Sequence, residues 1–191
     1  MNLYRFAQGF VRVVLFPVFR IKTVGKENIP SEGPLIMAAN HRSNLDPPIV
    51  AITNPRQLNF MAKSELFKNK LFGGLITKLG AFPIHRGRGD IAAFKTALKI
   101  FQNSGVMLMF PEGGRVKNGE SRSAKPGVSM IAAKCGVPVV PVHISGEYKW
   151  MHKITVTYGK PIDFAKYKGQ KLSSEDIQEL ADGILENIYN L

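Results

Sequence analysis

His41 and Asp46 are the two side chains in this sequence whose types and spacing best suit a proton transfer. An imidazole titrates near neutral pH and can take a proton from an alcohol, and a neighbouring carboxylate fixes its tautomer and stabilises the imidazolium. Five residues along an ideal helix correspond to about 140° around the axis, so an unbroken helix would keep the two side chains apart. We therefore expect the chain to turn between Arg42 and Leu45. The alternative is a loop histidine followed by an Asp46 that caps a helix.

A glycine-containing turn, Glu112-Gly113-Gly114-Arg115, follows an apolar run that ends at Phe110. Glycines let the backbone approach a ligand closely, so that N–H groups face an anion. The planar donor fork of Arg115 suits a phosphate, and Glu112 could hold Arg115 or a substrate hydroxyl. The turn therefore predicts an anion-binding site, with a tight turn and a surface ion pair as the alternative.

Two further basic residues close apolar runs, Lys63 after 58–62 and Arg86 after 81–85. In open α/β sheets ligands bind beyond the carboxyl ends of the strands. Each cation alone is best explained as a solvated side chain. Together with Arg115, however, they predict one anionic group held over the sheet.

Short apolar runs that alternate with helical patterns indicate an α/β fold, with a mostly parallel central sheet flanked by helices. The expected strands are 35–39, 58–62, 81–85, 106–110 and 137–144, with a later strand expected at 154–158, at an edge of the sheet. The expected helices are 2–19, 90–104, 127–134 and a C-terminal helix capped by Ser173 with Asp176. No repeat or linker is visible, so residues 1–191 are expected to form a single domain.

The first 20 residues are expected to form an amphipathic membrane-contact helix. Its large apolar residues recur at helical spacing, with Arg5 and Arg12 between them; they are Leu3, Phe6, Phe10, Val13 and Val14. A helix packed on the core is the equal alternative. The segment 66–79 also mixes apolar residues with lysines, as suits an anionic membrane surface. The apolar stretch 10–19 is too short to span a bilayer.

The composition is strongly basic, with 26 Lys and Arg against 14 Asp and Glu and a net charge of +12. Such a charge attracts nucleic acid or anionic lipid and does not choose between them. The single cysteine, Cys135, excludes an internal disulfide and a multi-cysteine metal site. None of His85, His143 and His152 lies in a metal-ligand pattern, so no metal is expected.

Four ordered blocks in this sequence resemble those of the glycerolipid acyltransferases with an HX4D motif, and within them the lysophosphatidic acid acyltransferases. The blocks are Asn40-His41-x4-Asp46, Phe82-Pro83-Ile84-x-Arg86, Phe110-Pro111-Glu112-Gly113 and Val137-Pro138-Val139-Val140-Pro141-Val142. They span about residues 35–145, more than half of the chain. Four blocks in order are a much stronger signal than any one of them.

The resemblance implies a general base, His41, with Asp46 as its orienting partner. It implies acceptor binding by Lys63, Arg86, Glu112 and Arg115, and a Val137 block that lines the acyl or acyl-donor side. It also implies that no metal or organic cofactor is needed, only an acyl-CoA or acyl carrier protein thioester as donor. The acyl group would pass directly to the sn-2 hydroxyl of lysophosphatidic acid, with backbone N–H groups near Gly113 or Gly114 as candidate oxyanion donors.

One departure from the family pattern concerns the acceptor. The third block commonly has Thr before its Arg, where this chain has Gly114. A contact from a hydroxyl group is therefore lost, and other acceptors remain open: glycerol 3-phosphate, another lysophospholipid or a lyso-aminolipid. A non-enzymatic basic module that binds nucleic acid is the remaining alternative, although no nucleic-acid motif is present. The resemblance favours a peripheral or monotopic protein on the cytoplasmic face of the cell membrane.

Overall fold

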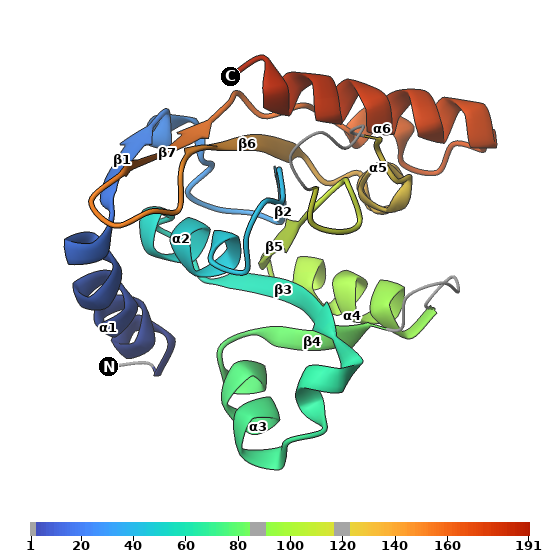
Figure 1. Ribbon diagram of the computed structural model, residues 1–191. Coiled ribbons are helices and arrows are strands. Elements are labelled where there is room, and N and C mark those ends of the chain that lie inside the picture. The colour runs from blue at the N-terminus through green and yellow to red at the C-terminus, as the bar shows by residue number, and fades with distance from the viewer. Residues whose placement is uncertain (1–2, 85–90, 117–122) are drawn as a thin grey trace.

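A seven-stranded sheet forms the centre of the protein in a computed structural model that describes residues 3–84, 91–116 and 123–191. The strand order is β1-β7-β6-β2-β5-β3-β4 (Figure 1). The strands are β1 Arg20–Val24, β2 Leu35–Ala39, β3 Leu58–Lys63, β4 Ala81–Ile84, β5 Val106–Met109, β6 Val139–Gly146 and β7 Lys153–Tyr158. All neighbouring pairs are parallel except β6 with β7, so the expected α/β fold with a mostly parallel sheet is confirmed.

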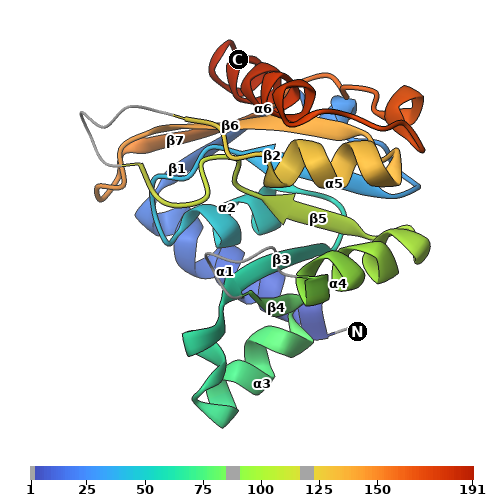
Figure 2. The same cartoon turned by 90° about the vertical axis from the view of Figure 1, so that its right-hand side faces the viewer.

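Helices cover both faces of this sheet. The helices are α1 Leu3–Val18, α2 Asp46–Thr53, α3 Lys70–Lys78, α4 Ile91–Gln102, α5 Gly127–Cys135 and α6 Ser174–Tyr189. Apolar residues of α1 and α2 pack on one face, and those of α4, α5 and α6 pack on the other. Seen from the side, α4 and α5 lie in front of the sheet and α1 lies behind it (Figure 2). The strand β2 is central to both cores, because all five of its residues are buried.

Four elements differ from what the sequence predicts. Strand β7 is not at an edge, because β1 pairs along its outer side. The exposed, charged pattern of β1 is typical of an edge strand and gave no apolar signal. A helix after Asp46 was considered only as the alternative, and α3 was not anticipated as a helix. Helix α2 begins at Asp46 and continues through Pro47, where proline is tolerated because the N–H groups of the first turn have no acceptor within the helix.

The outer side of α1 is apolar and exposed. Phe10 and Val13 are 64% and 73% exposed, and Leu3, Phe6 and Val14 are also exposed, whereas Tyr4 and Leu15 on the inner side are buried. The five apolar residues identified from the sequence therefore do not pack on the core. Within the described residues, no helix has both the length and the hydrophobicity required to pass through a bilayer.

The polar residues of α1 hold the end of α2. Arg12 donates a hydrogen bond to the carbonyl of Ile52, and Gln8 donates to that of Ala51 at 2.6 Å. Arg5 donates to the carbonyl of Pro55 at 3.0 Å. Carbonyls in the last turn of a helix have no partner within that helix, and cations near them are favourable. Both arginines of α1 therefore hydrogen-bond to carbonyl groups of the protein itself.

Candidate active site

His41 lies just beyond the carboxyl end of the central strand β2. The preceding residue, Asn40, is fully buried and extends the sheet with its side chain. Its amide Nδ2 donates to the carbonyl of Ile144 at 3.0 Å, and its Oδ1 accepts from the N–H of Ile144 at 2.7 Å. The backbone at His41 is thereby fixed between β2 and β6.

The predicted contact between His41 and Asp46 is present. Nδ1 of the ring lies 2.8 Å from Oδ2 of Asp46. Residues 41–43 are not helical, a turn follows at 44–45, and α2 starts only at Asp46, as the predicted break in the helix requires. The N–H groups of Arg42 and Ser43 donate to the same Oδ2 at 2.6 and 2.7 Å. Asp46 is thus a buried carboxylate that also begins a helix, and it fixes both the imidazole and the turn that carries it.

The other ring nitrogen, Nε2, is left to accept a proton. With Nδ1–H donated to Asp46, the neutral ring has its lone pair at Nε2. None of the described residues hydrogen-bonds Nε2, and the His41 side chain is 15% exposed. The ring stacks on Phe110, with the centroids 4.0 Å apart and the planes at 20°. His41 is therefore held on one face and at one nitrogen, as a general base must be.

Glu112 holds the main chain of His41. Its Oε2 accepts the N–H of His41 at 2.6 Å, and its Oε1 accepts the hydroxyl proton of Tyr189 at the end of α6. The carboxylate is buried, with 8% of the residue exposed. The turn that follows also returns to His41, because the N–H of Val116 donates to the carbonyl of His41 at 3.0 Å. The two predicted sites are therefore one site.

The predicted anion-binding residues lie at the same edge of the sheet. Lys63 ends β3 and is exposed, and the turn with Gly113, Gly114 and Arg115 follows the adjacent β5. Gly113 has φ +69°, a backbone conformation that favours glycine. Arg86 lies outside the described residues, two positions beyond the last residue of β4, which pairs with Lys63. The contact of these residues with an acceptor stays a prediction.

The valines of the Val137 block do not line the acyl-donor side as expected, because they are buried in the protein. Val137, Val139, Val140 and Val142 are at most 2% exposed and belong to the two cores. They occupy the start of β6 and the approach to it, next to β2, where both faces of the sheet are covered by helices. A strand in this position cannot present its side chains to an acyl donor.

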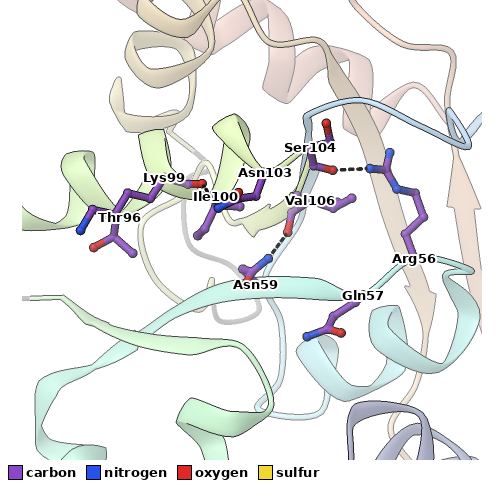
Figure 3. Close-up of a pocket in the computed structure, with 10 residues that line it drawn as sticks. Arg56, Gln57, Asn59, Thr96, Lys99, Ile100, Asn103, Ser104 and Val106 are labelled. Atoms are coloured by element: carbon purple, nitrogen blue, oxygen red, sulfur yellow. Dashed lines mark hydrogen bonds between the residues drawn. The ribbon is translucent and has the colours of Figure 1, made fainter. Parts of the chain in front are cut away.

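An open cavity of about 420 Å³ lies at the other end of the strands (Figure 3). It is lined by residues before and at the start of β3 and β5, among them Arg56, Asn59 and Val106. The Arg56 guanidinium donates to the carbonyls of Gly33 and Ser104, among others. Burial lowers the pKa of Arg56. This guanidinium therefore ties three loops together, and the cavity is separate from His41.

Sequence reasoning missed three aromatic residues of the site: Phe110, Tyr148 and Tyr189. Phe110 was visible as the residue before Pro-Glu-Gly, but its stacking on His41 has no sequence signal. Tyr148 donates its hydroxyl proton to Oδ1 of Asp46, and Tyr189 donates to Glu112. Both tyrosines come from distant parts of the chain. Among the described residues, no cluster of three or more His, Cys, Asp or Glu could hold a metal ion.

Comparison with known proteins places these residues in a family context. Residues 20–145 match the family described as Acyltransferase. The 1-acyl-sn-glycerol-3-phosphate acyltransferase of Streptococcus pneumoniae is 32% identical, covering 98% of this chain and 72% of the relative. That of Bacillus subtilis is 27% identical, covering 99% and 96%.

A solved structure shares the fold as well as the sequence similarity. The crystal structure of the 1-acyl-sn-glycerophosphate acyltransferase from Thermotoga maritima matches with a TM-score of 0.70 and 28% identity. The match covers 96% of this chain and 78% of that one. Together with the family match, it decides against the alternative of a non-enzymatic nucleic-acid-binding module.

Proposed function

The chain belongs to the acyltransferase family, and on that premise we propose that it transfers a fatty acyl group from a thioester to the sn-2 hydroxyl of lysophosphatidic acid, giving phosphatidic acid. The observation that carries the proposal is the hydrogen bond between Nδ1 of His41 and Asp46, which leaves Nε2 as the basic atom. It stands in a chain that matches this family over residues 20–145.

The reaction is a direct attack on the acyl carbonyl. Nε2 of His41 accepts the proton of the acceptor hydroxyl while the hydroxyl oxygen forms a bond to the carbonyl carbon of the thioester. Asp46 stabilises the imidazolium that forms. The tetrahedral oxyanion then collapses, the carbon–sulfur bond breaks, and the imidazolium returns its proton to the departing thiolate. Ester and thiol are the products, and the histidine is regenerated without a covalent acyl-enzyme or a cofactor.

The acceptor phosphate is proposed to lie over the neighbouring strand ends. Lys63 is an exposed cation at the end of β3, Arg115 is an exposed cation in the turn after β5, and Arg86 follows β4. The main-chain N–H groups of Gly113 and Gly114 are the proposed donors for phosphate or oxyanion. Removing Arg115 as Arg115→Met would weaken acceptor binding, because a charge-assisted contact to phosphate is lost.

The catalytic part of this proposal is tested by acyl transfer to lysophosphatidic acid with acyl-CoA and acyl carrier protein thioesters compared. The His41→Ala variant should fold and lose turnover. His152→Ala is the matched control, because its imidazole is half exposed and pairs with Glu147 at the surface. Near-normal turnover in His41→Ala would overturn the mechanism, and the more efficient thioester identifies the donor.

The acceptor is tested separately, because Gly114 replaces the usual Thr. The panel contains lysophosphatidic acid, glycerol 3-phosphate, another lysophospholipid and a lyso-aminolipid, each with one acyl donor. We expect lysophosphatidic acid to give the highest kcat/KM. A preference for another member of the panel would replace the acceptor while leaving the chemistry at His41 in place.

We also propose that α1 and α3 contact the cytoplasmic face of the cell membrane. In addition to the exposed face of α1, α3 has exposed apolar residues: Leu71 is 89% exposed, and Phe72 and Leu75 are each 47% exposed. Trp150, at 76% exposure, adds an aromatic side chain of the kind enriched at membrane interfaces. In Figure 1, α1 lies at the left of the molecule and α3 at the bottom, whereas α6 lies at the top. The net charge of +12 suits anionic lipid.

Vesicle sedimentation tests this contact. Phe10→Asp should reduce binding to vesicles that contain phosphatidylglycerol, because it places a charge on the proposed contact face. Ile91→Asp is the matched control: this residue is 71% exposed but belongs to α4, on the other side of the sheet. Equal binding by the two variants would contradict the assignment of α1.

A further inference from the structure

The segment between β6 and β7 brings a tyrosine onto the carboxylate that orients the general base. Tyr148 donates its hydroxyl proton to Oδ1 of Asp46, while Nδ1 of His41 meets Oδ2 (2.8 Å). We propose that Tyr148 is a positioning residue of the acyl transfer, which fixes the Asp46 carboxylate in the orientation that His41 needs. The inference rests on the function proposed above, to which it adds a third residue.

The two oxygens of Asp46 accept different numbers of hydrogen bonds. Oδ2 accepts from the ring of His41 and from the N–H groups of Arg42 and Ser43, all within 2.8 Å. Within the described parts of the chain, Tyr148 is the donor that reaches Oδ1. The last torsion of an Asp side chain is broad, so hydrogen bonds at both oxygens restrict it more than hydrogen bonds at one oxygen alone. Tyr148 therefore opposes the rotation that would draw Oδ2 away from the imidazole.

Tyr148 is itself held by the end of α1. Its ring meets that of Phe19 edge to face, with the centroids 5.8 Å apart and the planes at 88°. Three residues later, the N–H of Met151 donates to the carbonyl of Val18 at 2.8 Å. The turn is thus anchored on both sides of Trp150, whose side chain points into solvent. An anchored side chain can hold Asp46, whereas a loose one could not.

The electrostatics of the site make the hydroxyl a donor. Burial, and next the charge of Asp46, raise the pKa of Tyr148, whereas Arg42 opposes the shift. Tyr148 therefore keeps its proton and shares it with Oδ1, which draws negative charge away from the side facing the ring. Glu112, at the N–H of His41, is the other carboxylate close to this histidine. Without the hydroxyl, Asp46 would keep more of its negative charge on the side that faces the ring.

The test compares Tyr148→Phe with Tyr158→Phe in the full chain. Tyr158 is the matched control because it is also buried and its hydroxyl meets Thr53 of the same helix α2 at 2.7 Å, away from Asp46. Tyr148→Phe should lower kcat about tenfold with KM little changed. Tyr158→Phe should change thermal stability and leave both kinetic readouts in place.

A second readout needs no substrate. In protein labelled with ¹⁵N-histidine, the His41 ring signals are assigned by their loss in His41→Ala. Tyr148→Phe should shift and broaden the Nδ1–H signal, and Tyr158→Phe should do neither. Unchanged His41 signals in Tyr148→Phe would overturn the positioning role. If the wild-type protein did not acylate lysophosphatidic acid, the proposed function would fail, while the NMR comparison would still decide on Tyr148.

Discussion

Two buried carboxylates meet at His41, and they act on different parts of it. Asp46 binds the ring at Nδ1, whereas Glu112 binds the main-chain N–H at 2.6 Å. Each is backed by a tyrosine from the later part of the chain, Tyr148 for Asp46 and Tyr189 for Glu112. The ring contact changes charge during a proton transfer, and the main-chain contact does not. We therefore expect Asp46 to act on the chemistry and Glu112 to act on the geometry.

The largest effect should follow from Asp46→Asn. An amide oxygen can still accept from the ring and the two N–H groups, and the amide nitrogen can donate to Tyr148, whose hydroxyl then accepts. The variant should therefore fold. Because the charge that stabilises the imidazolium is gone, kcat should fall by about 10³–10⁴-fold. Steady-state kinetics beside a thermal melt measure both; a loss of tenfold or less would assign the charge stabilisation to another group.

A smaller effect is expected for Glu112→Gln, which makes the same chemical change on the other side of His41. Its amide can accept from the main-chain N–H and donate to Tyr189. A charge-assisted hydrogen bond becomes a neutral one, about half as strong, so kcat should fall by about tenfold or less. The measurement compares the loss of kcat in Glu112→Gln with that in Asp46→Asn. Equal losses in the two variants would mean that Glu112 also takes part in the chemistry.

The sequence predicts the fold and the His41–Asp46 contact well, for physical reasons that are local. The strand 35–39 is a continuous apolar run because it is buried on both faces, and its observed bounds are the predicted ones. The turn before Asp46 follows from the period of a helix. By contrast, β1 escaped prediction because an edge strand carries charged residues and no apolar pattern.

The rest of the site depends on contacts between distant residues. Tyr148 and Asp46 are 102 positions apart, and Tyr189 and Glu112 are 77 apart. No spacing rule joins such pairs, since only the packing of the β6–β7 turn and of α6 brings them together. The same applies to Arg5 and Arg12. Their charge suggested a bilayer interface, whereas their hydrogen bonds to the end of α2 are visible only in three dimensions.

The second tyrosine gives a prediction of smaller size. Tyr189→Phe removes the hydroxyl from Glu112, which keeps the N–H of His41 as a donor. We expect a loss of unfolding free energy of about 1 kcal/mol and a change in kcat/KM of no more than about threefold. Chemical denaturation measures the free energy of unfolding, and steady-state kinetics on the same preparation measure kcat/KM. A loss of kcat as large as that of Tyr148→Phe would contradict the distinction between Asp46, which holds the ring of His41, and Glu112, which holds its main chain.

The smallest effect on turnover should come from Arg12→Met, which keeps the length of the side chain and removes its hydrogen bond to the carbonyl of Ile52. The helix α2 then loses a donor at its end opposite to Asp46, and unfolding should become easier by about 1 kcal/mol. Because Asp46 at the other end keeps its four donors, kcat should stay close to that of the wild type. Arg20→Met is the control for loss of an exposed cation. A large fall in kcat with Arg12→Met alone would show that α1 transmits its position along α2 to the catalytic pair.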